Sequence, residues 1–159
     1  MRIYKFQGGV VVAYNEQFMR RCIELANIAA AGGDVPVGAV VVRNGEIIGE
    51  GINRREQRKN PVLHAEIEAI EAAAEALGGW RLDNCDLYVT LEPCPMCAGA
   101  IINSRIKNVY FGAYDKKAGS LGTLTDLSEI KYNHKPVVWG GMLQDECANQ
   151  LSVFFKKLR

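Results

Sequence analysis

The chain has 159 residues, about the length of one domain, and its 48% hydrophobic and 23% charged residues are ordinary for a globular protein. This composition excludes a disordered chain, a collagen-like repeat and a coiled coil, and the net charge of +1 neither requires nor excludes a nucleic-acid partner. The longest apolar run, residues 35–42, is too short to cross a bilayer, and the N-terminus lacks a secretory signal pattern. The sequence therefore predicts a cytoplasmic protein that makes no contact with a membrane.

The N-terminal part of the chain predicts a short extension followed by a helix. Residues 16–31 have apolar side chains at helical spacing, with Asn15 as the N-cap and Gly32-Gly33 as the stop signal. Residues 1–13 lie outside this pattern and are interpreted as an N-terminal extension without an assigned role. A single domain is expected to occupy residues 14–159, because no linker or repeat divides them.

A strand hairpin is predicted next. Residues 35–43 and 46–52 have the composition of strands, and Asn44-Gly45 between them is the strongest short signal for a hairpin turn. A polar stretch, residues 53–60, follows and is expected to be a loop.

Residues 64–77 predict a second helix that ends at Gly78-Gly79. Its apolar face is expected to consist of Ile67, Ile70, Ala74 and Leu77. The acidic residues of the same helix, apart from Glu66, are interpreted as its solvated face: Glu68, Glu71 and Glu75.

The second half of the chain alternates strands with helices. The expected elements are a strand at 86–91, a helix at 94–103, a strand at 108–111, a short helix at 124–130, a strand at 136–139 and a helix at 144–158. Strands alternating with helices behind an antiparallel hairpin imply an α/β fold. The predicted fold class is a three-layer α/β/α sandwich with a mixed five-stranded sheet.

The five cysteines are an odd number in a chain without a secretory signal, which argues against a disulfide framework and for metal binding or buried thiols. Cys22 and Cys147 occupy apolar positions of predicted helices and are expected to be buried thiols. Cys85, just before a strand, is expected to have a structural role. Cys94 and Cys97 remain as candidate metal ligands.

Two short segments predict a zinc site, and they contain His64 and the pair Cys94 and Cys97. If Pro93 opens the helix, both thiols lie in its first turn, where the helix dipole favours the thiolates that bind metal. One imidazole and two thiolates suit a tetrahedral zinc with water in the fourth position. A structural site requires a fourth protein ligand, and the other histidine, His134, lies in a different segment, so a catalytic zinc is the better hypothesis.

Glu66 follows His64 by two residues and is a candidate proton shuttle beside a zinc-activated water. Residues i and i+2 of a regular helix point in different directions, so His64 must lie at or just outside the first turn for both side chains to converge. A Cys-x-x-Cys pair on its own is more typical of a redox motif or a structural zinc site. A His-x-Glu pair on its own is more typical of an ordinary helix surface. Their combination makes a zinc hydrolase the leading hypothesis.

These segments resemble the signature of zinc-dependent nucleobase deaminases, His-x-Glu followed by Pro-Cys-x-x-Cys. From about residue 15 to the C-terminus the chain is similar to the bacterial tRNA-specific adenosine deaminases of the cytidine and deoxycytidylate deaminase superfamily. The shared segments include 35–39, 51–53, 63–66, 80–82, 87–94, 104–106, 111–113, 133–134 and 154–155. The resemblance implies a cytidine deaminase-like fold over residues 14–159 and hydrolytic conversion of the wobble adenosine of an arginine tRNA to inosine.

The same resemblance implies roles for individual residues. His64, Cys94 and Cys97 would bind one zinc ion per subunit, with no other cofactor, and Glu66 would shuttle protons. The substrate-binding residues would be Asn53, Ala65, Asp115 and Lys117, with Asn53 on the base and the last two on the anticodon-loop nucleotides. The implied partners are the anticodon stem-loop of tRNA and a second copy of the chain in a homodimer.

Two clusters of charge fit an RNA partner, since specific RNA recognition favours splayed loops that stack on aromatic or arginine side chains. Basic residues gather at 54–59, and the C-terminal segment 154–159 combines two phenylalanines with cationic residues.

The alternative enzyme is a zinc-dependent deaminase of a free base or nucleotide, of guanine or cytidine type, because Pro-Cys-Pro-Met-Cys also occurs in guanine deaminases. A non-catalytic, zinc-stabilised RNA-binding module is the third hypothesis, and Glu66 argues against it because structural zinc needs no proton shuttle.

Overall fold

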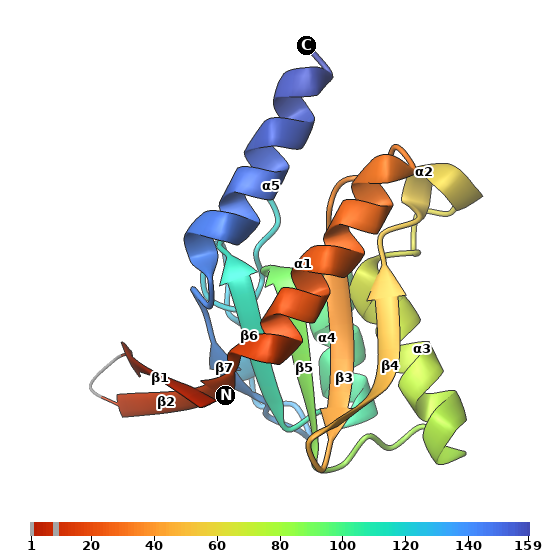
Figure 1. Ribbon diagram of the computed structural model, residues 1–159. Coiled ribbons are helices and arrows are strands. Elements are labelled where there is room, and N and C mark those ends of the chain that lie inside the picture. The colour runs from red at the N-terminus through yellow and green to blue at the C-terminus, as the bar shows by residue number, and fades with distance from the viewer. Residues whose placement is uncertain (1, 8–9) are drawn as a thin grey trace.

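The computed structural model describes the backbone of residues 2–7 and 10–159 and the side chains of residues 14–159. In this part of the chain the strands form a two-stranded sheet and a five-stranded sheet of order β4-β3-β5-β6-β7 (Figure 1). The central sheet consists of β3 (Gly38–Arg43), β4 (Glu46–Ile52), β5 (Cys85–Leu91), β6 (Asn108–Ala113) and β7 (Val137–Trp139). Strand β3 is antiparallel to β4 and β5, whereas β5, β6 and β7 are parallel, so the sheet is mixed as predicted.

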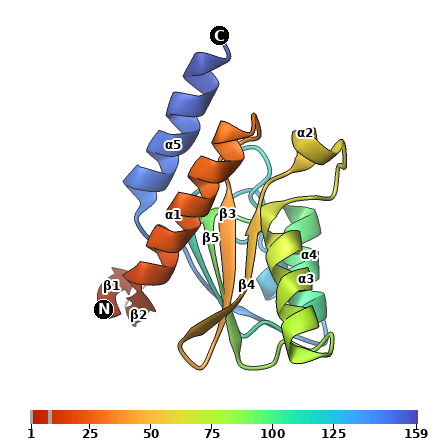
Figure 2. The same ribbon diagram turned by 45° about the vertical axis from the view of Figure 1, so that its right-hand side comes forward.

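Helices cover both faces of the sheet and complete the predicted three-layer α/β/α sandwich. One face packs against α1 (Glu16–Ala31) and α5 (Gln144–Lys157), and the other packs against α3 (Ala65–Leu77) and α4 (Pro95–Ser104) (Figure 2). The expected buried thiols lie in the first of these layers, since Cys22 and Cys147 are both buried there. Cys85 begins β5 and is also buried. No helix of the described part is long and apolar enough to cross a membrane.

The predicted hairpin is confirmed. Asn44 and Gly45 connect β3 to β4 with φ angles of 51° and 78°, the positive values that a type I′ turn requires. Strand β3 begins at Gly38, three residues later than predicted, because residues 35–37 turn out of the sheet. Their backbone closes a turn in which the Val37 N–H donates to the Val35 carbonyl at 2.9 Å. Val35 and Val37 instead line a pocket that is described below.

The buried face of α3 differs from the prediction. The side chains at the centre of its contact with the sheet are Ala65, Ala69 and Ala73, all fully buried. The predicted residues are only partly buried: Ile67, Ile70, Ala74 and Leu77. The reason lies in β4, where Gly49 and Gly51 have no side chains. A Cβ at Gly51 would lie 2.1 Å from the Ala65 carbonyl oxygen, and one at Gly49 would lie 2.4 Å from the Ala69 carbonyl oxygen. The alanine stripe therefore packs directly onto the backbone of the strand.

The N-terminal residues form a hairpin that the sequence did not predict. Strand β1 (Arg2–Gln7) pairs with β2 (Val10–Asn15) in an antiparallel sheet, while residues 1 and 8–9 lie outside the described residues. The expected boundary between residues 13 and 14 thus falls inside β2. Strand β2 leads directly into α1, whose predicted N-cap is confirmed, because the Asn15 side chain accepts a hydrogen bond from the Gln17 N–H at 3.0 Å.

Three local predictions need correction. The polar stretch after β4 contains a short helix, α2 (Arg55–Arg58), whose N–H groups at Glu56 and Gln57 donate to the buried carboxylate of Asp34. The helix predicted at 124–130 is only a 3₁₀ turn, η1 (Leu127–Glu129), because a backbone bridge between Leu121 and Asp126 and further turn hydrogen bonds occupy the preceding residues. Helix α4 begins at Pro95 and not at Pro93.

Candidate metal centre

The two segments that predict a zinc site meet at the N-termini of α3 and α4. His64 is the N-cap of α3 and Cys94 is the N-cap of α4, both with extended backbone, and Cys97 lies in the first turn of α4. The expectation that His64 stands just outside its helix is confirmed. The prediction that both thiols lie inside the first turn is wrong for Cys94, because the ring of Pro95 occupies the first helical position. Both helices direct the positive end of their dipoles at this point.

The donor atoms have the spacing that a tetrahedral zinc requires. His64 Nδ1 lies 3.5 Å from Cys94 Sγ and 3.6 Å from Cys97 Sγ, and the three atoms lie within 4.8 Å of one another. Bonds of about 2.0 Å to nitrogen and about 2.3 Å to sulfur, at tetrahedral angles, separate the two ligand atoms by about 3.6 Å. The residues present therefore fit a zinc ion with one coordination position left for water.

The contact between the two thiols shifts their pKa values in opposite directions. A hydrogen bond from the Cys97 thiol lowers the pKa of Cys94 to about 4, and the same contact raises the pKa of Cys97. The hydrogen bond with Cys94 raises the pKa of His64. Metal ligands must be deprotonated, so a divalent cation that binds here displaces the protons that these side chains carry.

Glu66 lies beside this cluster on the buried side of α3. Its side chain is 4% exposed, and burial raises its pKa to about 7. A carboxyl group that titrates near neutral pH can both accept and return a proton under working conditions. The arrangement thus combines three zinc-binding side chains with a buried carboxyl group beside them.

A pocket of about 190 Å³ opens next to the zinc ligands. It is lined by the predicted residues Asn53, Ala65, Glu66 and Asp115 together with His64 and Cys94. The sequence analysis assigned no site role to the individual residues of its remaining walls, which are Val35, Val37, Arg55, Leu91, Glu92 and Ala118. Lys117, the last predicted substrate residue, is exposed on the loop beside Asp115 and does not line the pocket.

Asn53 is held by hydrogen bonds at the pocket wall. Its Nδ2 donates to the Val35 carbonyl at 3.2 Å, and its Oδ1 accepts from the Arg55 N–H at 3.1 Å. An amide has two N–H donors and two lone pairs, so one of each remains for a ligand. Asp115 is also fixed, since its Oδ1 accepts from the N–H groups of Lys117 and Ala118 at 2.9 and 3.3 Å.

Two polar residues outside the zinc cluster, His134 and Glu68, have structural partners. His134 Nε2 lies 2.6 Å from the Ile106 carbonyl oxygen, consistent with its exclusion as a ligand. Glu68 was expected to be solvated, but its carboxylate accepts hydrogen bonds from Arg54 Nε at 3.0 and 3.2 Å and from the Ile52 N–H at 3.3 Å. This correction matters because the pair joins the end of β4 to the first turn of α3, close to His64.

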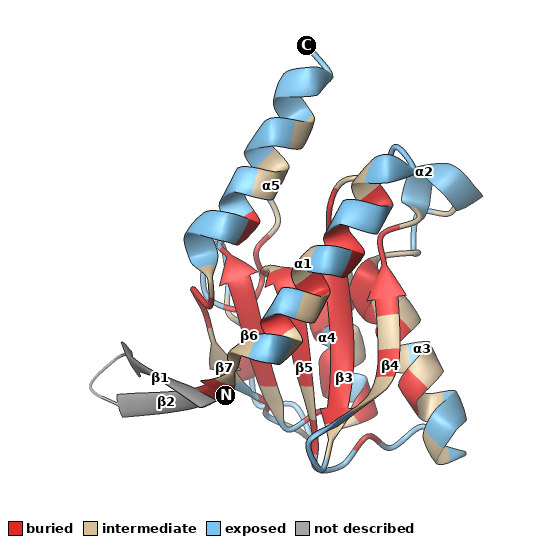
Figure 3. Cartoon of the chain, viewed as in Figure 1, coloured by how far each residue is buried: buried red, intermediate tan, exposed pale blue. Residues whose placement is uncertain are grey.

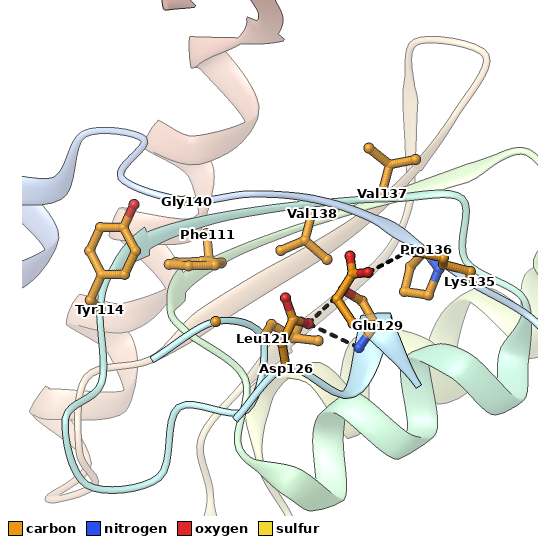
Figure 4. A pocket seen from close by; sticks show the side chains of 12 residues that line it. Phe111, Tyr114, Leu121, Asp126, Glu129, Lys135, Pro136, Val137, Val138 and Gly140 are labelled. Atoms are coloured by element: carbon orange, nitrogen blue, oxygen red, sulfur yellow. Dashed lines mark hydrogen bonds and ion pairs between the residues drawn. The ribbon is translucent and has the colours of Figure 1, made fainter. Parts of the chain in front are cut away.

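A second, larger cavity of about 510 Å³ lies on the other side of the loop that follows β6 (Figure 4). Phe111 and Tyr114 form one end of it, with their rings edge to face at 5.1 Å, and the ion pair between Lys135 and Glu129 forms the other. It contains none of the predicted zinc ligands. The smaller pocket is therefore the site at which the metal chemistry takes place.

Comparison with known proteins supports this assignment of the zinc cluster. Residues 13–113 match the model of a family described as the cytidine and deoxycytidylate deaminase zinc-binding region. The tRNA-specific adenosine deaminase of Bacillus subtilis (strain 168) is 49% identical over 146 residues, which cover 91% of each protein. The tRNA-specific adenosine deaminase of Haemophilus influenzae is 47% identical over 148 residues, covering 92% of this chain and 86% of that protein.

Two solved structures give the same comparison in three dimensions. A structure from a study of A-to-I editing by tRNA:A34 deaminases at the wobble position of transfer RNA is 40% identical, with a TM-score of 0.83 over 86% of this chain and 100% of that one. The guanine deaminase of Bacillus subtilis is 32% identical, with a TM-score of 0.61 over 76% of this chain and 87% of that one. Both sequence and fold are more similar to the first structure.

Proposed function

This chain belongs to the cytidine and deoxycytidylate deaminase zinc-binding family, among its tRNA-specific adenosine deaminases, and we propose that it converts the wobble adenosine of an arginine tRNA to inosine. The observation on which the proposal chiefly rests is the convergence of His64, Cys94, Cys97 and Glu66 beside one pocket. The reaction is hydrolytic: water adds to C6 of adenine, ammonia departs, and inosine remains.

The residues of the chain divide this chemistry between them. His64, Cys94 and Cys97 would hold zinc, which supplies a Lewis acid that activates water at neutral pH. Glu66 accepts one proton of the attacking water and delivers it to N1 of the base, and it then carries the second proton of the same water to the departing amine. Its buried position keeps the carboxyl group close to the reacting atoms and away from bulk solvent, and its raised pKa allows both transfers.

The pocket selects and orients the base in this proposal. The pocket is lined by the buried Glu66, so the base must leave the stacked anticodon loop to reach it before it can react. Asn53 has one N–H and one lone pair left for hydrogen bonds to the base. Ala65 forms the wall beside the zinc ligands, while Asp115 and Lys117 contact the neighbouring nucleotides from the loop after β6.

The charge and shape of one end of the molecule support an RNA substrate. Leu91, Glu92 and Asp115 line the pocket, which therefore lies at the C-terminal ends of β5 and β6. Helix α2 and the C-terminal end of α5 lie at the same end of the sheet (Figure 1). Helix α5 extends beyond the sheet, and its last two turns are largely exposed (Figure 3). This segment has Phe155 and Leu158 beside the cationic Lys156 and Lys157, and α2 presents Arg55 and Arg58. Such groups stack on unpaired bases and contact phosphates.

The proposal also includes a homodimer, a cytoplasmic location and one catalytic domain over residues 14–159 with residues 1–13 as its extension. An apolar surface beside α4 supports the dimer. Gly99 and Ala100 of that helix line a shallow hollow together with Tyr132, whose side chain is 52% exposed. Light scattering of the purified chain measures the oligomeric state.

Incubation of the zinc-loaded protein with an arginine-tRNA anticodon stem-loop tests the proposal. Inosine is read as guanosine in sequencing, so the product reveals both the substrate and the position. A matched stem-loop with uridine in place of the wobble adenosine is the control, because uridine has no exocyclic amine and is not read as guanosine. Absence of inosine, while free guanine is turned over, would contradict the proposed substrate.

Deamination of free guanine is the second candidate, and the Pro-Cys-Pro-Met-Cys segment and the similarity to a guanine deaminase favour it. The two candidates differ in their response to salt. RNA binding releases counterions, so the affinity for a stem-loop falls as salt rises, whereas turnover of an uncharged base is nearly independent of salt.

A further inference from the structure

Glu92 is a buried carboxylate to which the reaction gives no role. It follows β5, two residues before the zinc ligand Cys94, and its side chain is 1% exposed. We propose that Glu92 is a positioning residue that fixes the loop 114–123 at the wall of the substrate pocket. The anchoring is independent of which molecule is deaminated, but its kinetic consequence rests on the proposed function.

The hydrogen bonds of Glu92 hold both ends of the loop. Its Oε1 accepts from the N–H groups of Leu121 and Thr123 at 3.3 and 3.0 Å. Its Oε2 accepts from the Asp115 N–H at 3.0 Å and from the Thr123 hydroxyl at 2.5 Å. A carboxylate offers acceptors only, so it satisfies four donors that would otherwise be left without partners beneath the loop. One side chain therefore connects the two ends of the nine-residue segment 115–123.

Gly119, in the middle of the loop, lies against the same carboxylate. A Cβ at this position would be 2.4 Å from Glu92 Oε2 and 2.5 Å from the Asp115 carbonyl oxygen. The loop thus approaches Glu92 at both ends and at its centre. Two backbone hydrogen bonds continue the attachment, from the Ser120 N–H to the Pro93 carbonyl at 2.9 Å and from the Glu92 N–H to the Ala113 carbonyl at 2.8 Å.

The loop needs this anchor because it separates two cavities. On one side Asp115 and Ala118 line the substrate pocket, and on the other Tyr114, Leu121 and Gly122 line the larger cavity shown in Figure 4. Leu121 packs into the core, but Asp115 and Ala118 face a cavity, so the hydrogen bonds to Glu92 fix the end of the loop that lines the substrate pocket. Asp115, which lines the substrate pocket, is thereby attached to the chain segment 92–97 that provides the zinc ligands Cys94 and Cys97.

Two substitutions release the loop by different means. Glu92→Gln replaces one acceptor by an amide N–H group that faces donors, and Gly119→Ala pushes the loop away from an intact carboxylate. The loop contains the exposed Lys116 and Lys117, so trypsin reports its release. We expect cleavage after these lysines, identified by mass spectrometry of the fragments, to become at least about tenfold faster in both variants, since proteolysis follows the population of the open form.

The kinetic effect distinguishes positioning from a general loss of structure. If the loop is docked in about a tenth of the molecules, the KM for the stem-loop rises about tenfold, while kcat changes little because bound substrate selects the docked form. Zinc content stays at the wild-type value. Glu75→Gln and Gly79→Ala are matched controls, because Glu75 is exposed and a Cβ at Gly79 meets no atom within 4 Å; neither should alter cleavage or KM.

The outcomes separate this proposal from the proposed function. Unchanged cleavage after Lys116 and Lys117 in both variants would overturn the anchoring role. Loss of zinc from Glu92→Gln, with Gly119→Ala normal in every assay, would also overturn it, because Glu92 would then act through Cys94. If Glu92→Gln does not fold, Gly119→Ala and the milder Thr123→Val, which removes one hydrogen bond, decide the question. Faster cleavage in a protein that forms no inosine would support the anchor and contradict the tRNA substrate.

Discussion

Gly51 lies so close to the Ala65 carbonyl oxygen that a Cβ on the glycine would be 2.1 Å from it. Ala65 begins α3 directly after the zinc ligand His64, and Gly51 belongs to the neighbouring strand β4. The absence of one side chain in the sheet therefore determines how close the first turn of the helix, with His64 and Glu66, comes to the core.

Gly51→Ala should disturb both stability and metal binding. The added methyl group has no space, and overpacking of this kind costs about 1–3 kcal/mol of unfolding free energy. The displacement of α3 also moves His64, so we expect weaker zinc retention during dialysis against a mild chelator. Urea unfolding and metal analysis measure the two effects, with Gly79→Ala as the control. Equal stability of the two variants would contradict the packing argument.

Glu66→Gln should leave the metal in place and abolish most of the activity. The amide has the shape of the carboxyl group but cannot carry protons, so the rate should fall by about 10²–10⁴-fold. Zinc content and inosine formation are measured on the same preparation. Glu75→Gln serves as the control because Glu75 lies on the exposed side of the same helix. A Glu66 variant with wild-type turnover would exclude the assigned role.

Zinc removal should destabilise the fold through His64. Since metal binding contributes to folding free energy, chelation should lower the Tm of the wild-type protein by about 5 °C or more. His64→Ala should contain no zinc, and chelation should not change its Tm. His134→Ala is the matched control, since its ring contacts the Ile106 carbonyl and lies outside the zinc cluster. Zinc lost equally from both variants would contradict the ligand assignment.

The ion pair between Arg21 and Glu50 predicts a dependence of stability on pH. Arg21 donates from Nε and Nη2 to the two carboxylate oxygens at 2.8 and 3.0 Å, and these hydrogen bonds lower the pKa of Glu50. The folded pKa lies below the unfolded value, so the stabilisation is present above about pH 4.3. It is lost as the pH falls through the lowered pKa.

Glu50→Gln should therefore be destabilising at pH 7 and less destabilising at pH 3, because the pH then approaches the lowered pKa of Glu50. The cost at pH 7 should be only about 0.5 kcal/mol, because both side chains are 37% exposed and solvent screens the pair. Urea unfolding at the two pH values measures the difference. If the substitution lowers the free energy of unfolding by the same amount at both pH values, packing and not charge accounts for the loss.

The lysines at the end of α5 should contribute to RNA binding through their charge. For the double variant Lys156→Ala and Lys157→Ala, the slope of log affinity against log salt should fall by about 1–2, since each phosphate contact contributes about 0.7–0.9. Titration of a fluorescent stem-loop at several salt concentrations measures the slope. Lys107→Ala, at the other end of β6 from the pocket, is the control. An unchanged slope would place the RNA elsewhere on the surface.

Local signals in the sequence predicted most of the helices and the hairpin, because they depend on residues that are neighbours in the chain. The Asn44-Gly45 turn and the glycines after α1 and α3 mark the ends of their elements. The zinc cluster was also predictable. The spacing of His64 and Glu66 allows convergence only if the histidine caps the helix, and the structure places it there.

Features that depend on distant residues were not predictable in this way. The buried alanine face of α3 is determined by Gly49 and Gly51 in another element, so the larger apolar side chains of the helix gave the wrong face. The role proposed for Glu92 likewise depends on backbone N–H groups between Asp115 and Thr123, and such donors leave no pattern in the sequence.

The positions of the zinc ligands have a consequence for folding. Cys94 and Cys97 are three residues apart, so an unfolded chain already holds two donors close together, but His64 lies 30 residues from Cys94, and the whole of β5 lies between them in the sequence. The third donor thus becomes available only once the tertiary structure has assembled. Tight metal capture during refolding therefore reports the docking of α3 and α4 on the sheet, and its rate measures that step directly.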